Sequence, residues 1–309
     1  LTSGGTANSN NFPLPQDTGV FENTGLNSGA TITTVSNMAL GGIDMSARTL
    51  PMTLSAGTTN YVFGDWVNGS GTTLSGTGAF VFSGIGFNTS ITGAGKTFSQ
   101  RFTVERPFGS LTLLDAVTLS STSSVALILY SGTLNLSAYT LSVAGGFSTT
   151  STGTNPVSTQ NTVFNPRTLA IGSGTLSLGA SFAVSNSFEL TFTGTGTISM
   201  TSSAIKNFVG GSSDFSGITL NQGGAGELNI TGTNTFGGIS NTRASVSATS
   251  INFGTTVQKV ASFTASGQAG RLLTLAGTSA TSPGSFAYTG AADLSLDYLI
   301  LTGIRAYQI

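Results

Sequence analysis

Three acidic residues near the start of the chain are spaced so that they could act together. Glu22, Asp44 and Asp65 follow one another at steps of about 21 to 22 residues, a spacing within the range of known structural repeats. If one turn of a repeating fold takes that length of chain, the three carboxylates lie above one another, beside Arg48. Two carboxylates cleave a glycosidic bond when they lie about 5 Å apart, with retention of configuration, or about 6.5 to 9.5 Å apart, with inversion.

This spacing has two interpretations. The one we favour is structural or incidental, because some coincidence of register is expected among eleven acidic residues. The other is a glycan or calcium site, in which Asp44 and Asp65 are the candidate catalytic residues of a glycan depolymerase.

The residue types that are missing exclude other chemistry. The chain has no Cys, which removes disulfides, thiolate metal sites and thiol nucleophiles. It has no His, which removes the usual nucleophilic triads and imidazole acid–base catalysis. We therefore expect no metal and no cofactor. Ten basic residues are scattered singly in a chain of net charge −1, so binding of nucleic acid or of anionic lipid is not expected. Membrane insertion is not expected either, because no apolar run is long enough.

Two aromatic residues are candidates for ligand binding. Trp66, the sole tryptophan, and Tyr61 could stack on a sugar ring. Packing in the core or at an end of the fold is the alternative, and the one we favour.

Charged residues near the end of the chain offer no catalytic pair. Asp293 and Asp297 would lie about 13 Å apart along a shared strand, too far for a dyad. Arg271 and Asp293 are separated by one step of the same length as that between Glu22 and Asp44. We expect them to form a cross-coil ion pair that contributes about 0–1 kcal/mol.

The elements that must position these residues are strands of a repeating fold. Apolar-x-apolar doublets recur near the C-terminal end, and their first members follow one another at steps of 23, 22 and 21. Alternation of period two indicates a strand, and a fixed period of this length indicates repeats that stack on one another. The pattern predicts an all-β, single-stranded parallel β-helix (β-solenoid) with coils of about 21–22 residues. The doublets are Leu228/Ile230, Ile251/Phe253, Leu273/Leu275 and Leu294/Leu296.

A second series lies upstream. The phrase SGTLNL at 131–136 recurs as SGTLSL at 173–178. Taking Leu134, Leu176, Ile198 and Ile218 as equivalent gives steps of 42, 22 and 20, of which the first is two periods. The full chain then makes on the order of 14 coils and a rod of roughly 65 Å. We expect right-handed winding from the general preference of strand crossovers. A β-sandwich or propeller would instead show turn signals roughly every 8 to 12 residues, and the longer period outweighs them.

The composition suits such a rod. Charged residues make up 7% of the chain, far below the ~25% of ordinary domains. In a solenoid, equivalent side chains lie ~4.8 Å apart, so a repeated charge would repel itself while Ser and Thr stack without that cost. The 43 glycines supply corners. The longest apolar run, residues 125–130, is far shorter than the ~20 residues of a membrane helix.

The chain divides into three parts. Residues 1–30 are expected to form an N-terminal cap or attachment segment, because they begin polar and are then broken by proline. Residues 31–296 form the parallel β-helix, with a loop insertion near 148–166. Residues 297–309 are more apolar, and we expect a C-terminal cap or a segment that docks on another chain.

Several phrases resemble the β-helical structural proteins of tailed bacteriophages. They are GKTF (95–98), GSLTLLDAVTL (109–119), SGTLNL (131–136) with YTLSV (139–143), RTLAIGSGTL (167–176), and FTASGQAGRLLTLAG (263–277) with LSLDYL (294–299). The resemblance covers most of the chain after residue 30, and secreted bacterial adhesins use similar repeats. It implies a virion appendage such as a tail fibre, tailspike or neck fibre, often homotrimeric. It carries no catalytic motif.

These observations lead to one expectation and two alternatives. We expect a non-enzymatic phage virion structural protein, an elongated appendage involved in host attachment. Its expected partners are copies of itself, with a trimer favoured, other virion proteins and a host-surface glycan. The alternatives are a glycan-depolymerising tailspike and a secreted bacterial adhesin or surface-filament subunit, the latter extracellular or on the cell surface.

Overall fold

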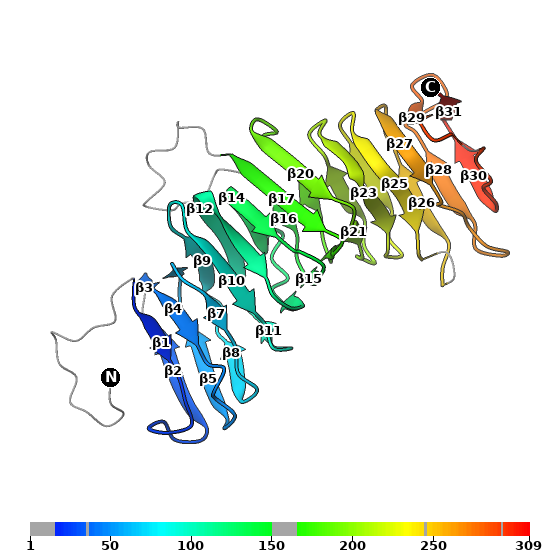
Figure 1. Ribbon diagram of the computed structural model, residues 1–309. Coiled ribbons are helices and arrows are strands. Elements are labelled where there is room, and N and C mark those ends of the chain that lie inside the picture. Colours follow the sequence, from blue (N-terminus) through cyan, green and yellow to red (C-terminus); the bar gives the residue numbers. More distant parts are fainter. Residues whose placement is uncertain (1–15, 35–36, 150–165, 244–245, 292) are drawn as a thin grey trace.

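The strands of this protein stack into one elongated rod (Figure 1). The computed structural model describes residues 16–34, 37–149, 166–243, 246–291 and 293–309. Within these ranges the ladder pairings between named strands are all parallel, and no helix occurs. The predicted parallel β-solenoid is therefore confirmed. In the same part of the chain, no helix has the length and apolarity needed to cross a membrane.

The first face of the rod runs along its whole described length. Twelve strands pair in sequence order, one from each coil, without a break. They are β3 (Met38–Leu40), β6 (Asn60–Val62), β9 (Ala79–Ser83), the first part of β12 (Arg101–Leu113), the first part of β14 (Leu127–Asn135), β16 (Phe147–Ser148), β19 (Phe182–Ala183), β22 (Lys206–Val209), β24 (Leu228–Thr231), β26 (Thr249–Asn252), β28 (Leu273–Ala276) and β30 (Leu299–Thr302).

The second face lies across a corner from the first. In β12 and β14 the strand itself turns this corner, so that its last residues pair on the second face. The other members are β1 (Thr18–Val20), β4 (Gly42–Asp44), β7 (Trp66–Val67), β10 (Asn88–Thr92), β17 (Arg167–Gly172) and β20 (Leu190–Gly194).

The third face closes each coil. Its first three strands form a separate sheet and the others a longer one. They are β2 (Ala30–Thr34), β5 (Met52–Ala56) and β8 (Thr72–Ser75), then β11 (Thr97–Phe98), β13 (Val117–Leu119), β15 (Thr140–Val143), β18 (Thr175–Leu178), β21 (Thr197–Met200), β23 (Asp214–Gln222), β25 (Thr235–Asn241), β27 (Val257–Phe263), β29 (Gly284–Tyr288) and β31 (Ile304–Gln308).

Coil length varies more than the sequence pattern predicts. Along the first face Asn60 pairs with Phe80, a step of 20, whereas Leu273 pairs with Leu299, a step of 26. The described residues therefore make about 12 coils instead of 14. At ~4.8 Å per coil this is a rod of roughly 55–60 Å.

Variable coil length also shifts the register of the predicted doublets. Leu228 pairs with Ile251 as expected, but Ile251 pairs with Leu275 and not with Leu273. The prediction that Leu294 and Leu296 form the fourth doublet of the series is wrong, because Leu275 pairs with Leu301. Leu294 and Leu296 lie before β30 and pack against the core from a connecting segment.

The upstream series is corrected in the same way. Leu176 does pair with Ile198, but Ile198 pairs with Leu220 and not with Ile218. Leu134 belongs to the second face, where it pairs with Leu169, and the partner of Leu176 is Leu141. The repeated phrase SGTL thus occupies two different positions in the coil.

The ladders reach past the boundaries expected from the sequence. β1 pairs with β4, so stacking already includes Thr18–Val20. β30 and β31 form the last rung, so the segment 297–309 contributes two paired strands. Most of the loop expected near 148–166 lies outside the described residues, as do residues 1–15 of the expected N-terminal segment.

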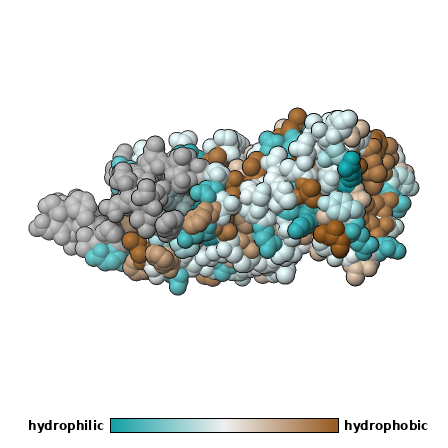
Figure 2. All heavy atoms as spheres, turned by 90° about the horizontal axis from the view of Figure 1, so that it is seen from above, coloured by the Kyte–Doolittle hydropathy of each residue, from teal (hydrophilic) through white to brown (hydrophobic). Residues whose placement is uncertain are grey.

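One continuous apolar core fills the coils. Inward side chains alternate with outward polar ones, as in β5, where Met52, Leu54 and Ala56 are buried. Figure 2 shows the consequence, a largely polar surface on which apolar side chains gather at the end that β30 and β31 form. The exposed apolar residues there are Tyr298, Ile300, Leu301, Tyr307 and Ile309.

Candidate functional site

The three N-terminal acids do not form a ladder. Asp44 pairs with Val20 on the coil before it and with Val67 on the coil after it. Glu22 and Asp65 each lie two positions away from that row, since the coils here are longer than the spacing of the acids. The stacked carboxylates of the alternative interpretation are therefore not formed.

Each of the two candidate catalytic carboxylates is held by a serine, that of Asp44 within its own turn and that of Asp65 on the next coil. Oδ1 of Asp44 accepts a hydrogen bond from the backbone N–H of Ser46 at 2.9 Å. Hydrogen bonds from the side chain and backbone of Ser46 lower the pKa of Asp44. Oδ1 of Asp65 accepts from the backbone N–H and the hydroxyl of Ser90, at 2.7 and 2.9 Å. The general acid of a glycosidase needs a raised pKa, so the environment of Asp44 does not suit that role. No group of three potential acidic metal ligands occurs in the described part of the chain.

Arg48 is a structural residue. Its guanidinium is buried and donates to four backbone carbonyl oxygens at 2.8–3.0 Å, those of Glu22, Leu26, Asn27 and Pro51. These carbonyls belong to connecting segments of two adjacent coils. Arg48 therefore fastens the first coils together through their backbones.

Trp66 lies in the core, as the favoured interpretation predicted. Its side chain is 0% exposed and its ring centroid lies 4.7 Å from that of Phe80 and 5.7 Å from that of Phe98. Its indole N–H donates to Oδ1 of the buried Asn68 at 3.0 Å. Stacking of Trp66 on a sugar is excluded.

Tyr61 points outward from β6 and is partly exposed. Burial and the nearby Glu105 raise the pKa of Tyr61.

The charged residues near the end of the chain are also not aligned as expected. Leu273 pairs with Leu299, so the coil at this point is longer than the spacing of Arg271 and Asp293, and the two residues do not lie level with each other. Asp293 and Asp297 lie in the connecting segment before β30, not in a strand.

What the rod presents instead is an uncharged stretch of the second face, from β10 to β20. Outward side chains alternate with the buried row of Leu111, Leu134 and Leu169, and each lies level with its equivalents on adjacent coils. The rows contain hydroxyl and amide groups, one alanine and no charge. The first row is Asn88, Ser110, Thr133, Thr168 and Thr191, and the second is Ser90, Thr112, Asn135, Ala170 and Thr193.

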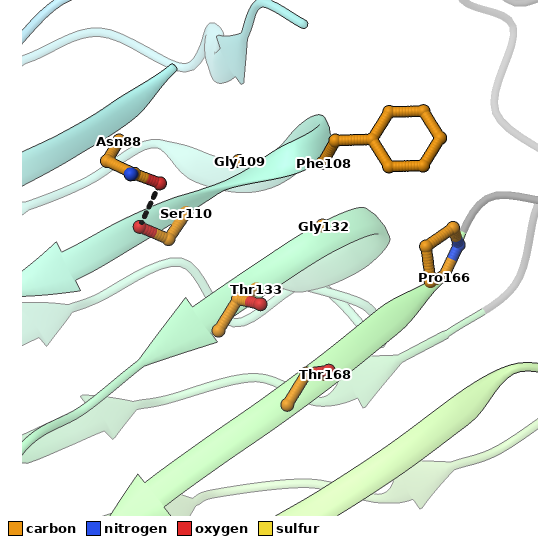
Figure 3. Close-up of a pocket in the computed structure, with 8 residues that line it drawn as sticks. All are labelled: Asn88, Phe108, Gly109, Ser110, Gly132, Thr133, Pro166 and Thr168. Carbon is orange, nitrogen blue, oxygen red and sulfur yellow. Dashed lines mark hydrogen bonds between the residues drawn. The ribbon is translucent and has the colours of Figure 1, made fainter. Parts of the chain in front are cut away.

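A shallow cavity of about 290 Å³ lies where this face meets the first (Figure 3). Phe108 projects from the corner of one coil, and Pro166 lies two coils further along. The lining is completed by four residues of the first polar row and by two corner glycines, so that it consists of Asn88, Phe108, Gly109, Ser110, Gly132, Thr133, Pro166 and Thr168. Within it, the hydroxyl of Ser110 donates to Oδ1 of Asn88 at 3.0 Å. Such a surface can hydrogen-bond and stack, but it contains no acid or base.

Sequence reasoning missed Phe108. The residue lies in the phrase Arg-Pro-Phe-Gly at 106–109, where proline and glycine mark a turn. An aromatic residue inside a turn has no core position to fill. The presence of Phe108 between a proline and a glycine could therefore have identified it as exposed.

Comparisons with protein-family models, with curated proteins and with solved structures give no match.

Proposed function

We propose that this chain is a non-enzymatic structural protein of a phage virion, an elongated fibre- or tailspike-like appendage involved in host attachment. The observation that carries the proposal is the first-face ladder, which joins about 12 coils without a break. Each of these coils hydrogen-bonds to the next, so the stack is a stiff spacer. A stiff spacer is what an appendage needs to hold a contact surface away from the particle.

The distribution of charge supports a structural role over a catalytic one. Arg48, Arg106, Arg167 and Lys206 are buried and bind backbone carbonyl oxygens at the corners. Asp44 and Asp65 bind backbone N–H groups. These charged groups are thus used to hold the chain's own backbone.

The two ends of such a rod have different tasks in this proposal. At the β30 and β31 end, Leu301 continues the core column of Leu275 but is 63% exposed. Tyr298, Ile300 and Ile309 add to this apolar surface. We assign this end to attachment, because exposed apolar patches mark protein contacts. Copies of the chain, with a trimer favoured, and other virion proteins are the partners that the proposal includes.

Immunogold labelling of the source particle tests the role. An antibody against this chain is expected to label a tail, neck or capsid fibre in negative-stain micrographs, and antibody pre-absorbed with the purified chain is the control. Label on a cell surface or on free filaments would contradict the virion assignment. It would favour the alternative of a secreted adhesin or surface-filament subunit.

A second experiment tests the depolymerase alternative. The double substitution Asp44→Asn and Asp65→Asn keeps the size of both side chains and removes both carboxylates. We expect any glycan cleavage by the purified chain to be the same in the wild type and the double variant, because the two acids are not paired. Cleavage that the wild type performs and the variant loses by a factor of about 100 or more would contradict the structural assignment of these acids.

A further inference from the structure

Phe108 is an exposed aromatic residue whose backbone is constrained by its neighbours. Its side chain is 74% exposed and its φ is +60°, a left-handed conformation that is costly for a bulky residue. Two residues earlier, the Arg106 side chain is buried and donates to the carbonyl oxygens of Val62 and Phe63 at 3.1 and 3.3 Å. Pro107 between them restricts the backbone. The corner is thus anchored from inside, and the ring is held outward in solvent.

The next coil leaves a gap beside this ring. Its corner residue is Gly132, at φ +76°, and a Cβ there would collide with the backbone oxygen of Arg106. No side chain therefore fills the position next to Phe108. On the following coil, the carbonyl oxygen of Pro166 accepts a hydrogen bond from the N–H of Gly132 at 2.9 Å. Phe108 and Pro166 consequently flank a notch with glycine at its base (Figure 3).

The side of the notch toward the second face is polar and uncharged. Asn88, Ser110, Thr133 and Thr168 lie level with one another on four successive coils, ~4.8 Å apart. Asn88 and Ser110 bond to each other, whereas no described residue hydrogen-bonds to the hydroxyl of Thr133 or Thr168. The two threonine hydroxyls can therefore bind a ligand.

We infer that this notch is a binding subsite for a neutral oligosaccharide. A sugar ring has an apolar C–H face and a rim of hydroxyls, and the notch offers an aromatic face beside a row of hydroxyl and amide groups. The lining has no charged side chain to pair with an acidic sugar. An extended peptide is the weaker fit, because backbone groups of the strands here are already paired within the ladder and cannot add a strand.

The inference rests on the proposed attachment role and makes it more specific. The notch is shallow, so one subsite binds weakly, and several copies on one particle would act together through avidity. Phe108 would supply the stacking contact, and Thr133 and Thr168 the hydrogen bonds that orient the sugar.

Glycan binding by the purified full chain tests the subsite. The probes are maltohexaose, cellohexaose and N-acetylchitohexaose as neutral sugars, with a heparin-derived hexasaccharide as the charged comparison. At least one neutral probe is expected to bind in isothermal titration, and the heparin fragment is not. Phe108→Ala is expected to weaken binding by about tenfold or more, as removal of an aromatic anchor does. Thr133→Val, which replaces the hydroxyl by a methyl group, should weaken it less.

Tyr139→Ala is the matched control. Tyr139 is an exposed aromatic residue at the corner between the second and third faces, outside the notch. Its loss should leave affinity unchanged, and circular dichroism should show all variants folded. Equal binding by Phe108→Ala and the wild type, or binding of the heparin fragment alone, would overturn the subsite. Failure of all neutral probes would overturn it too, while leaving the virion role, which the antibody label tests separately.

Discussion

Two regions of the core use aromatic side chains in different ways. In the coils of β7 to β12, rings from several faces meet at steep angles. Trp66 lies at 56° to Phe80, and Phe98 lies at 78° to Phe102, with centroids 4.7 and 4.9 Å apart. These rings come from three successive coils and from all three faces, so they interlock between coils.

In the coils of β16 to β22, equivalent residues stack along the rod. Phe147, Phe182 and Phe208 pair in register, with centroids 4.8 and 4.6 Å apart and planes within 25° and 8° of parallel. Such a column repeats the same side chain at the same position, so its geometry follows the coil spacing. A continuous core therefore does not require the same side chain at the same position of every coil, since both arrangements occur in one rod.

The two regions also differ in how they satisfy corner carbonyls. The first uses Arg106, which has two carbonyl partners, and burial lowers the pKa of Arg106 to about 10. The second also has an arginine, Arg167, but adds Lys206, which donates to the carbonyls of Ser202 and Gly226, and Gln222, which shares the Gly226 carbonyl. Arginine stays charged at every physiological pH, whereas a buried lysine can lose its proton.

The largest expected effect is in the stacked column. Phe182→Ala removes the middle ring, whose neighbours on both adjacent coils are fixed by the ladder and cannot close the cavity. We expect a loss of about 3–5 kcal/mol in local stability, measured by hydrogen exchange of segments near β19. Phe98→Ala in the interlocked region is the comparison. A smaller loss for Phe182 than for Phe98 would contradict the idea that a column repacks less easily.

The next effect concerns pH. Burial lowers the pKa of Lys206 to about 8, whereas the ordinary value of about 10.5 applies when the chain is unfolded. Between these values the unfolded chain holds a proton that the folded chain lacks, so stability rises with pH. We expect a gain of about 1–3 kcal/mol between pH 8 and pH 10.5.

Denaturation at several pH values measures this gain. Lys206→Met should remove the slope, since no titrating group is left at the corner. Lys259→Met, at an exposed lysine, is the control and should keep it. A slope that persists in Lys206→Met would assign the pH dependence to another group.

The smallest effect is expected at Trp66. Trp66→Phe keeps an aromatic ring among Phe80 and Phe98 but leaves Oδ1 of the buried Asn68 without its indole donor. We expect a loss of about 1–2 kcal/mol in guanidinium unfolding. If Trp66→Phe costs as much as Phe182→Ala, the first region is no more adaptable than the second.

The period of apolar doublets was enough to predict the fold, because stacking requires each coil to repeat the same in–out alternation. It did not predict the register. Coils change length at their corners, from a step of 20 at Asn60 to a step of 35 at Phe147, and chain length at a corner does not affect the core. A phrase such as SGTL fits any face, so Leu134 and Leu176 look equivalent in sequence and lie on different faces.

The site was predictable only in part. The core position of Trp66 followed from its being a large apolar residue beside a strand. The ladder of Glu22, Asp44 and Asp65 failed because it assumed a constant coil. Phe108 and Gly132 meet across two coils whose pairing shifts register between Glu105 and Ser110. No pattern in the sequence encodes that shift.

The first-face ladder has a mechanical consequence. Its hydrogen bonds run along the rod, and these ladder bonds join each coil only to its neighbours. A force that pulls the two ends apart therefore loads one rung at a time, and the coils peel off in sequence. Each peeled coil of about 22 residues releases roughly 70–80 Å of extended chain. The folded rod thus resists bending, yet under tension it dissipates energy by unfolding one coil at a time.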